Sequence, residues 1–276
     1  LIPSKPIVTH EVGQYFVYPY YNEIEKYTGS LKARNLEIFR ERLAEKGMSS
    51  LADDMHEASG MLAYNCYKLE IEAAMRSEYI SGFQLLDLQD FTGQGTALVG
   101  MLDAFMEEKS FAVKNNIRNK WIGFCSGIVI LAEIDSFVIT VGNTVTVPVN
   151  IRNMSGSPLK GTRLEWCIGS CKGTIDVPDN LIGLARIGEI TFSAEATGRN
   201  ELVLRIIDGA ETCISQNMYE FWAFEPSKDD FDIPAVIERD GITAYITEKL
   251  ELAEKLLAAG ERVIYLPNEL KDSIEG

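Results

Sequence analysis

The spacing of apolar residues divides the first part of the chain into short runs and longer stretches with helical spacing. Residues 7 and 8 are β-branched and suit a buried parallel strand, and a second apolar run covers residues 82–88. Between these runs, residues 33–47 predict a helix, and apolar residues recur near helical spacing over 50–79, where we expect one or two helices. The order of strand, helices and strand predicts the βα alternation of a parallel sheet.

Three neighbouring segments have weaker patterns. Residues 14–32 are rich in aromatic side chains and predict a loop after the first strand. Residues 97–108 predict a short helix, and residues 111–130 predict a crossover to the next part of the chain. We therefore expect residues 1–125 to form an α/β region.

From about residue 131 the apolar pattern changes to short strands separated by turn residues such as glycine, asparagine and proline. Regular short strands of this kind indicate an immunoglobulin-like β-sandwich over residues 131–224. Alternation along the strands predicts that Trp166 and Phe192 face inward. The expected strands are residues 137–141, 145–151, 163–167, 188–192, 201–206 and 217–223.

The last part of the chain predicts a third region. Residues 225–232 have the composition of a charged linker. A strand over 244–247, a helix over 251–259 and a strand over 262–267 would form the start of an α/β domain, residues 228–276, truncated by the end of the chain. Because the sequence opens directly on a strand, we expect it to be a piece of a longer protein.

Composition narrows the classes of partner. The 276 residues are 46% hydrophobic, and 26 basic against 41 acidic residues give a net charge of −15. This charge argues against binding nucleic acid or an anionic membrane, because nothing offsets phosphate repulsion. No apolar run reaches the roughly 18 residues of a membrane helix, and no signal peptide is visible.

Cysteine and glycine spacing give no sign of a cofactor. Five cysteines and two histidines are present, and the pair Cys167 and Cys171 has no second pair to complete a zinc site. A local disulfide or free buried thiols both fit this spacing. The glycine-containing loop at residues 92–96 lacks the phosphate-loop pattern. We therefore expect neither a metal nor a cofactor.

Acidic residues follow both predicted parallel strands. Glu11 comes directly after the first apolar run and close to Gly13, whose flexibility lets the backbone turn. The second run leads into Asp87 and Asp90. In TIM (β/α)8 barrels the chemistry lies at the C-terminal ends of the strands, but a full barrel needs eight strands. We expect the other six to lie outside this sequence.

At this point the residues resemble a known family. Residues 6–13, PIVTHEVG, resemble the seventh barrel strand of glycoside hydrolase family 2, the β-galactosidase and β-glucuronidase group, with Glu11 in the position of the nucleophile. Residues 82–91, GFQLLDLQDF, resemble its eighth strand. Val12 replaces an aromatic residue of the family pattern and Leu86 replaces a tryptophan. The longer string GFQLLDLQDFTGQGTALVG resembles a subgroup of β-galactosidase sequences common in gut Bacteroidetes.

The resemblance covers residues 1 to about 125 and implies a fold and an activity. The fold would be multi-domain, with the C-terminal part of a catalytic barrel, an immunoglobulin-like sandwich and a truncated α/β unit. The activity would be that of a retaining exo-glycosidase that hydrolyses O-glycosidic bonds, which requires two carboxyl groups about 5–5.5 Å apart. Glu11 would supply the nucleophile.

The second catalytic group is expected elsewhere. In the family the acid/base belongs to an Asn-Glu pair on the fourth strand, which would precede this sequence. The pair Asn22-Glu23 lies in the wrong place to replace it. We therefore expect the chain alone to be inactive.

Four further residues are candidates for substrate contacts: His10, Tyr15, Asp87 and Asp90. Each has an alternative role, and Asp87 would bind sugar hydroxyls or support the site. His10 would orient Glu11 or serve as a structural histidine, and Asp90 would anchor a loop through backbone amides. The aromatic loop that carries Tyr15 would stack on sugar rings or simply pack.

Two classes of function remain open from the sequence. The first is the glycosidase, with an oligo- or polysaccharide substrate and, by resemblance, a periplasmic or extracellular location. The second is a non-catalytic module that binds carbohydrate or protein, which would not need two parallel strands that end in acids. The sugar, the linkage and the oligomeric state are left open.

Overall fold

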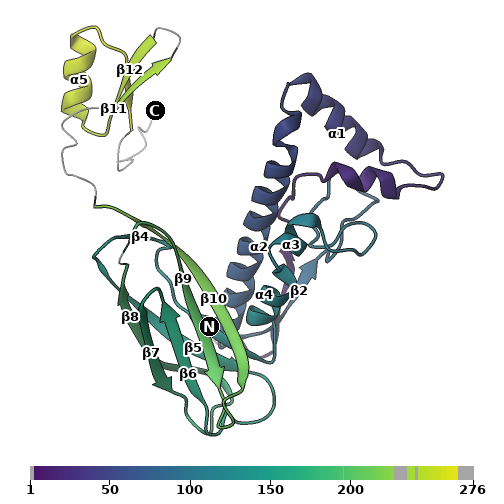
Figure 1. Ribbon diagram of the computed structural model, residues 1–276, viewed down its shortest axis with the longest axis vertical. Helices are drawn as coiled ribbons and strands as arrows, with labels where there is room; N and C mark the ends of the chain where they lie inside the picture. The colour runs from purple at the N-terminus through teal and green to yellow at the C-terminus, as the bar shows by residue number, and fades with distance from the viewer. Residues whose placement is uncertain (1–2, 195, 227–234, 240–241, 267–276) are drawn as a thin grey trace. The chain divides into compact units, whose positions relative to one another are not determined.

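The computed structural model describes residues 3–194, 196–226, 235–239 and 242–266. The chain forms two compact units, Leu1–Glu225 and Pro226–Gly276 (Figure 1). Within the described residues, every helix is too short or too polar to cross a membrane.

The first unit opens with a parallel pair of strands. Strand β1 (Ile7–Gly13) pairs in parallel with β2 (Ile80–Leu86), which confirms the predicted pairing. Two helices, α1 (Arg34–Glu45) and α2 (Ala52–Arg76), connect them. The predicted helical stretch over residues 50–79 is thus one long helix preceded by a single short turn.

Helix α2 covers this pair of strands. Its residues Tyr67 and Ile71 are fully buried, together with Phe111 of helix α3 (Ser110–Lys114) and Phe124 of helix α4 (Ile117–Phe124). The described part of the unit has only β1 and β2 in this sheet, so a barrel is not shown.

Residues 97–108 are not helical, which corrects the sequence prediction. The side chain of Asp103 explains the difference. Its Oδ1 atom accepts the backbone N–H groups of Phe105 (2.9 Å) and Glu107 (3.0 Å), and Met106 has a φ of 63°. An aspartate that binds nearby amides competes with helix formation and favours a turn. The predicted loop before α1 contains a short 3-10 helix, η1 (Tyr21–Lys26).

The second part of the unit is a β-sandwich of two sheets that share one core. In one sheet, β5 (Thr144–Asn153) lies between β3 (Ile128–Ala132) and β8 (Gly183–Ser193). The other sheet has the order β4 (Val138–Thr140), β10 (Cys213–Phe224), β9 (Gly198–Ile207), β6 (Arg163–Ile168) and β7 (Cys171–Asp176).

The sandwich differs from the sequence prediction in two respects. Strands β3 and β7 were not predicted, because residues 111–130 were interpreted as a crossover and residues 171–176 lack strong apolar alternation. The pairing is antiparallel throughout except between β4 and β10, which run parallel.

The two predicted core aromatics both face the sandwich interior. Phe192 is buried, and its ring lies 5.5 Å from that of Phe221 in an edge-to-face arrangement. Trp166 packs against the same core but is only half-buried, since it lies next to the edge strand β7. A Cβ on Gly173 of β7 would come within 2.7 Å of the Trp166 Nε1 atom, so glycine makes room for the indole.

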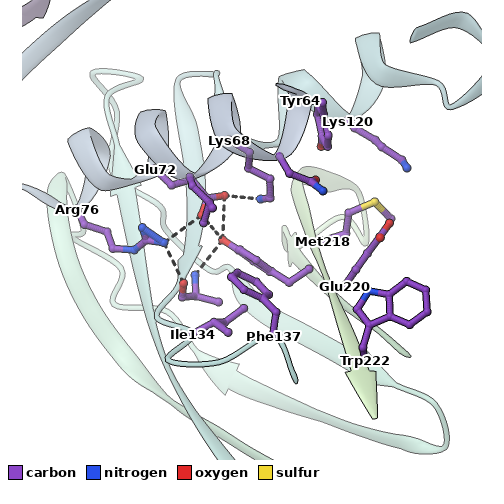
Figure 2. Close-up of a pocket in the computed structure, with 14 residues that line it drawn as sticks. Tyr64, Lys68, Glu72, Arg76, Lys120, Ile134, Phe137, Met218, Glu220 and Trp222 are labelled. Atoms are coloured by element: carbon purple, nitrogen blue, oxygen red, sulfur yellow. Dashed lines mark hydrogen bonds and ion pairs between the residues drawn. The ribbon is translucent and has the colours of Figure 1, made fainter. Parts of the chain in front are cut away.

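A buried carboxylate joins α2 to the sandwich. Glu72 is fully buried and accepts hydrogen bonds from Lys68 and Arg76 on its own helix (Figure 2). It also accepts hydrogen bonds from Asn217 (2.8 Å) and Tyr219 (3.0 Å) on β10. Burial of an ionised carboxylate is costly unless such partners surround it. This cluster therefore holds the two parts of the unit in one register.

The second unit is a small α/β arrangement. Strand β12 (Ile242–Thr247) pairs antiparallel with β11 (Ala235–Arg239) and parallel with β13 (Val263–Tyr265). Helix α5 (Leu250–Ala258) connects β12 to β13. Strand β11 was not predicted, and most of the predicted linker lies outside the described residues.

We predict that Glu72→Gln destabilises the first unit by about 3–5 kcal/mol, because it leaves the cations at Lys68 and Arg76 without their buried counter-charge. The matched control is Glu45→Gln at the exposed end of α1, expected to change stability by less than about 0.5 kcal/mol. Denaturant unfolding followed by tryptophan fluorescence measures both, since all three tryptophans belong to the first unit. Equal stabilities of the two variants would contradict the prediction.

Candidate functional site

Glu11 occupies an unusual backbone conformation at the end of β1. Its φ is 56°, in the left-handed region that non-glycine residues rarely adopt. The register of β1 on β2 pairs Thr9 with Phe83 and Val12 with Leu85, so two residues of β1 oppose one of β2. This is a β-bulge, a feature that re-aims a side chain. The Glu11 side chain is 54% exposed.

Gly13 and Tyr67 determine how the chain leaves β1. Gly13 has a φ of 115°, and a Cβ there would lie 2.3 Å from Cε1 of Tyr67. The Tyr67 hydroxyl donates to the carbonyl of Val99 (3.1 Å), and the Gly13 N–H donates to Glu70 (3.1 Å). Only glycine fits here, because both the conformation and the space exclude a side chain.

His10 lies beside Glu11. Its Nδ1 atom is 3.7 Å from Oε1 of Glu11, and both side chains are open to solvent. The structure thus brings together these two predicted site residues.

Asp87 reaches the same edge of the sheet. It follows Leu86, which pairs with Gly13, and it also has a left-handed φ, 59°. Both parallel strands therefore lead into an acidic residue with a strained backbone. The Asp87 side chain is half-buried. Burial of Tyr67 is the main cause that raises the pKa of its hydroxyl to about 12, and the negative charge of Asp87 adds to this rise.

Tyr15 turns back toward the helices. Its ring lies edge-on to Tyr67, with centroids 5.6 Å apart, and its hydroxyl bonds to Glu70. Burial, reinforced by Glu70, raises the pKa of the Tyr15 hydroxyl. Tyr15 therefore supports α2 and the exit of β1 in this structure.

Asp90 is held inside the protein. It is 4% exposed, and its Oδ1 atom accepts hydrogen bonds from Lys109 Nζ (2.8 Å) and the Gly100 N–H (3.0 Å). Burial raises the pKa of Asp90, while Lys109 opposes the rise. The geometry matches the loop-anchoring alternative considered for this residue.

Glu23, which is not among the residues predicted for the site, lies in a buried charged cluster. Glu23 is 5% exposed, and burial raises the pKa of its carboxyl to about 7. Lys109 and Lys26 oppose this shift, and Asp90 and Asp103 reinforce it. In the sequence, Glu23 is marked only as an acid within an aromatic segment. Its charged neighbours Asp90, Asp103 and Lys109 come from a distant part of the sequence.

This buried cluster adjoins a small cavity. The cavity has a volume of about 160 Å³ and is lined by Glu23, Asp90 and Tyr27, among others. Among the described residues, no group of three or more histidine, cysteine or acidic side chains is arranged to hold a metal. All five cysteines are free thiols.

Comparisons with known proteins give limited likenesses. No family model and no curated protein matches the chain. Among solved structures, a β-D-mannosidase from Dictyoglomus thermophilum aligns with a TM-score of 0.48 and 15% identity; the match covers 79% of this chain and 27% of that one.

Smaller β-domains also align, over about a third of the chain. The CARDB domain of the PF1109 protein from Pyrococcus furiosus covers 36% of this chain with 91% of its own, at 12% identity and a TM-score of 0.29. Fibronectin(III)-like modules of Clostridium thermocellum CbhA cover 35% with 98% of their own, at 10% identity and a TM-score of 0.24. None of these likenesses assigns the chain to a family.

We predict that Glu23 makes stability fall as the pH rises from about 4.5 to 7. Its folded pKa is about 7 against an ordinary value of 4.5, so the folded state holds the proton more tightly and loses this advantage as the pH passes the folded pKa. The loss is at most about 3 kcal/mol. Glu23→Gln should flatten this part of the pH–stability curve.

Denaturant unfolding between pH 4 and 8 tests the assignment. The control is Glu25→Gln, an exposed acid on the same 3-10 helix, which should keep the wild-type slope. A Glu23→Gln protein with an unchanged slope would show that another group titrates.

Proposed function

We propose that the C-terminal edge of the β1–β2 sheet belongs to the active site of a retaining exo-glycosidase, with Glu11 as the nucleophile. The observation that carries the proposal is the backbone of Glu11: a left-handed residue, at a bulge, at the end of a parallel strand, with an exposed carboxylate. Backbone strain of this kind persists where the surrounding structure enforces it, and it clusters at active sites.

The chemistry needs a carboxylate that is free to attack. In a retaining mechanism the nucleophile bonds to the anomeric carbon while an acid protonates the leaving oxygen, and water then cleaves the glycosyl–enzyme ester. The Glu11 carboxylate has no hydrogen bond to another described residue and approaches only the side chain of His10. We propose that the acid/base is a different carboxyl group, about 5–5.5 Å from Glu11 in the active enzyme.

The remaining candidates divide into two groups. Asp87 and His10 lie at the same edge as Glu11, and we propose that they bind substrate hydroxyls or orient the nucleophile. Tyr15 and Asp90 already have partners inside the protein, so we assign them to supporting the strand exit and the following loop.

The substrate class follows from the sequence motifs of the two strands. Their resemblance to family 2 favours a β-galactosidase-like specificity toward an oligo- or polysaccharide. We propose a periplasmic or extracellular site of action on the same ground. We expect residues 1–276 alone to show no turnover, because the acid/base is expected outside them.

We predict that Glu11→Gln lowers turnover of aryl β-glycosides by roughly four orders of magnitude in the natural polypeptide that contains this sequence, since the amide keeps the shape but not the nucleophile. The control is Glu78→Gln, an exposed acid beside the opposite end of β2, which should keep the wild-type rate. A panel of aryl glycosides measures all three proteins.

Covalent trapping distinguishes a nucleophile from a merely supporting acid. A 2-deoxy-2-fluoro aryl glycoside should leave a sugar ester on the peptide that carries Glu11, detectable by mass spectrometry. A wild-type protein that turns over substrate while Glu11→Gln retains the full rate would exclude Glu11 as the nucleophile.

A further inference from the structure

The small cavity beside the Glu23 cluster forms between two segments that are far apart in the sequence. It has a volume of about 160 Å³ and is lined by residues 23–36 on one side and 90–104 on the other. Neither Glu11, His10 nor Asp87 is among its lining residues. The proposed function therefore leaves this cavity without a role.

Glu23 is the buried acid of this region that lacks a counter-charge. Four carboxyl groups are buried in the described part of the chain, and three of them, Glu72, Asp90 and Asp103, form ion pairs. The carboxyl group of Glu23 is 5% exposed and forms neither an ion pair nor a hydrogen bond with a described residue. A buried carboxylate without such a partner is costly.

The two nearby cations are committed to other acids. Lys109 donates to Asp90 (2.8 Å), and Lys26 pairs with Asp103. Both lysines lower the pKa of Glu23, but burial outweighs them and raises it to about 7. The buried carboxyl group of Glu23 thus keeps either its proton or a cation from outside the described chain.

The carboxyl group of Glu23 lies among groups that line the cavity. Burial raises the pKa of the Tyr27 hydroxyl, and the charge of Glu23 is the next largest cause of this rise. Tyr27 lines the cavity and packs against the buried cluster that contains Leu36 and Leu98, which line it as well. The cavity therefore offers one acid beside an apolar wall.

The size and charge of the cavity restrict its ligand. Its volume is close to that of an engineered cavity of about 150 Å³ that holds benzene, so about six non-hydrogen atoms fit. Among the described residues, no group of three or more histidine, cysteine or acidic side chains is arranged for a metal ion. Lys26, Lys109 and the lining residue Lys32 would repel a second positive charge.

We propose that this cavity binds a small organic amine in its protonated form, with the ammonium group toward Glu23 and the carbon body against Tyr27, Leu36 and Leu98. The ammonium group supplies the counter-charge that Glu23 lacks, and hydrogen bonds between ionised partners are the strong ones. On binding, the carboxyl group of Glu23 releases its proton to solvent, and the amine stays protonated.

Titration calorimetry with matched probes on the full chain tests the need for the ammonium group. Cyclopentylamine, with six non-hydrogen atoms, should bind at least tenfold more tightly at pH 8 than cyclopentanol, its neutral counterpart. It should also bind at least tenfold more tightly than ammonium chloride, which lacks a carbon body. If the amine does not bind, or binds no better than either of these two probes, the proposal is overturned.

Variants locate the binding to Glu23. Glu23→Gln should weaken cyclopentylamine at least tenfold and leave cyclopentanol unchanged, because only the charged partner is lost. Glu25→Gln, at an exposed position of the same 3-10 helix, makes the same charge change and should keep the wild-type affinity. Thermal melting checks that both variants are folded. Equal affinities of the two variants for the amine would refute the site.

The pH dependence of the wild-type protein gives a test that needs no variant. The affinity for cyclopentylamine should rise about tenfold between pH 6 and pH 8, because the ionised fraction of Glu23 rises as the pH passes its pKa of about 7. The other charged groups around Glu23 are Lys26 on its own helix and Asp90, Asp103 and Lys109 from distant segments. Glu23→Gln keeps all four, so its affinity should not rise. A flat wild-type profile would overturn the proposal.

Discussion

The burial of one carboxylate organises the first unit. Glu72 is inaccessible to solvent, and an ionised carboxylate tolerates that environment only if donors surround it. Two donors come from residues one helical turn away on α2, and two come from β10, more than 140 positions further along the chain. Sliding the sandwich along the helix would separate charge from donor, so the register of the two parts is determined by this cluster.

Helix α2 also contacts the end of strand β1, so it connects the Glu72 cluster to the edge of the β1–β2 sheet. One side of the helix carries Glu72 toward the sandwich, while Tyr67 packs over Gly13 where β1 ends. Glu70, on the same helix, accepts the Gly13 N–H and bonds to Tyr15. The proposed nucleophile therefore stands on a strand end held by a long, well-anchored helix. Sites supported in this way keep their geometry better than sites on free loops.

Much of the fold was predictable because it follows from local periodicity. The parallel pairing of β1 and β2 follows from two apolar runs separated by helical sequence, and the sandwich follows from regular short strands with turn residues between them. Strand β7 was not predicted because apolar and polar residues alternate only weakly in its sequence, CKGTID. In the structure it is a strand because it pairs with β6. The helix expected over residues 97–108 failed because Asp103 binds two backbone amides and makes a turn.

For the candidate site, the sequence by itself determined that Glu11 and Asp87 follow parallel strands, since strand order and chain direction place such residues at one edge. It did not reveal the left-handed backbones of these two residues, of which that of Glu11 lies at the bulge in β1. Only the tertiary structure decided the roles of Glu23 and Glu72. Each is a single acid in the sequence, and its burial, its partners and the pKa of Glu23 depend on segments that meet only when the chain folds.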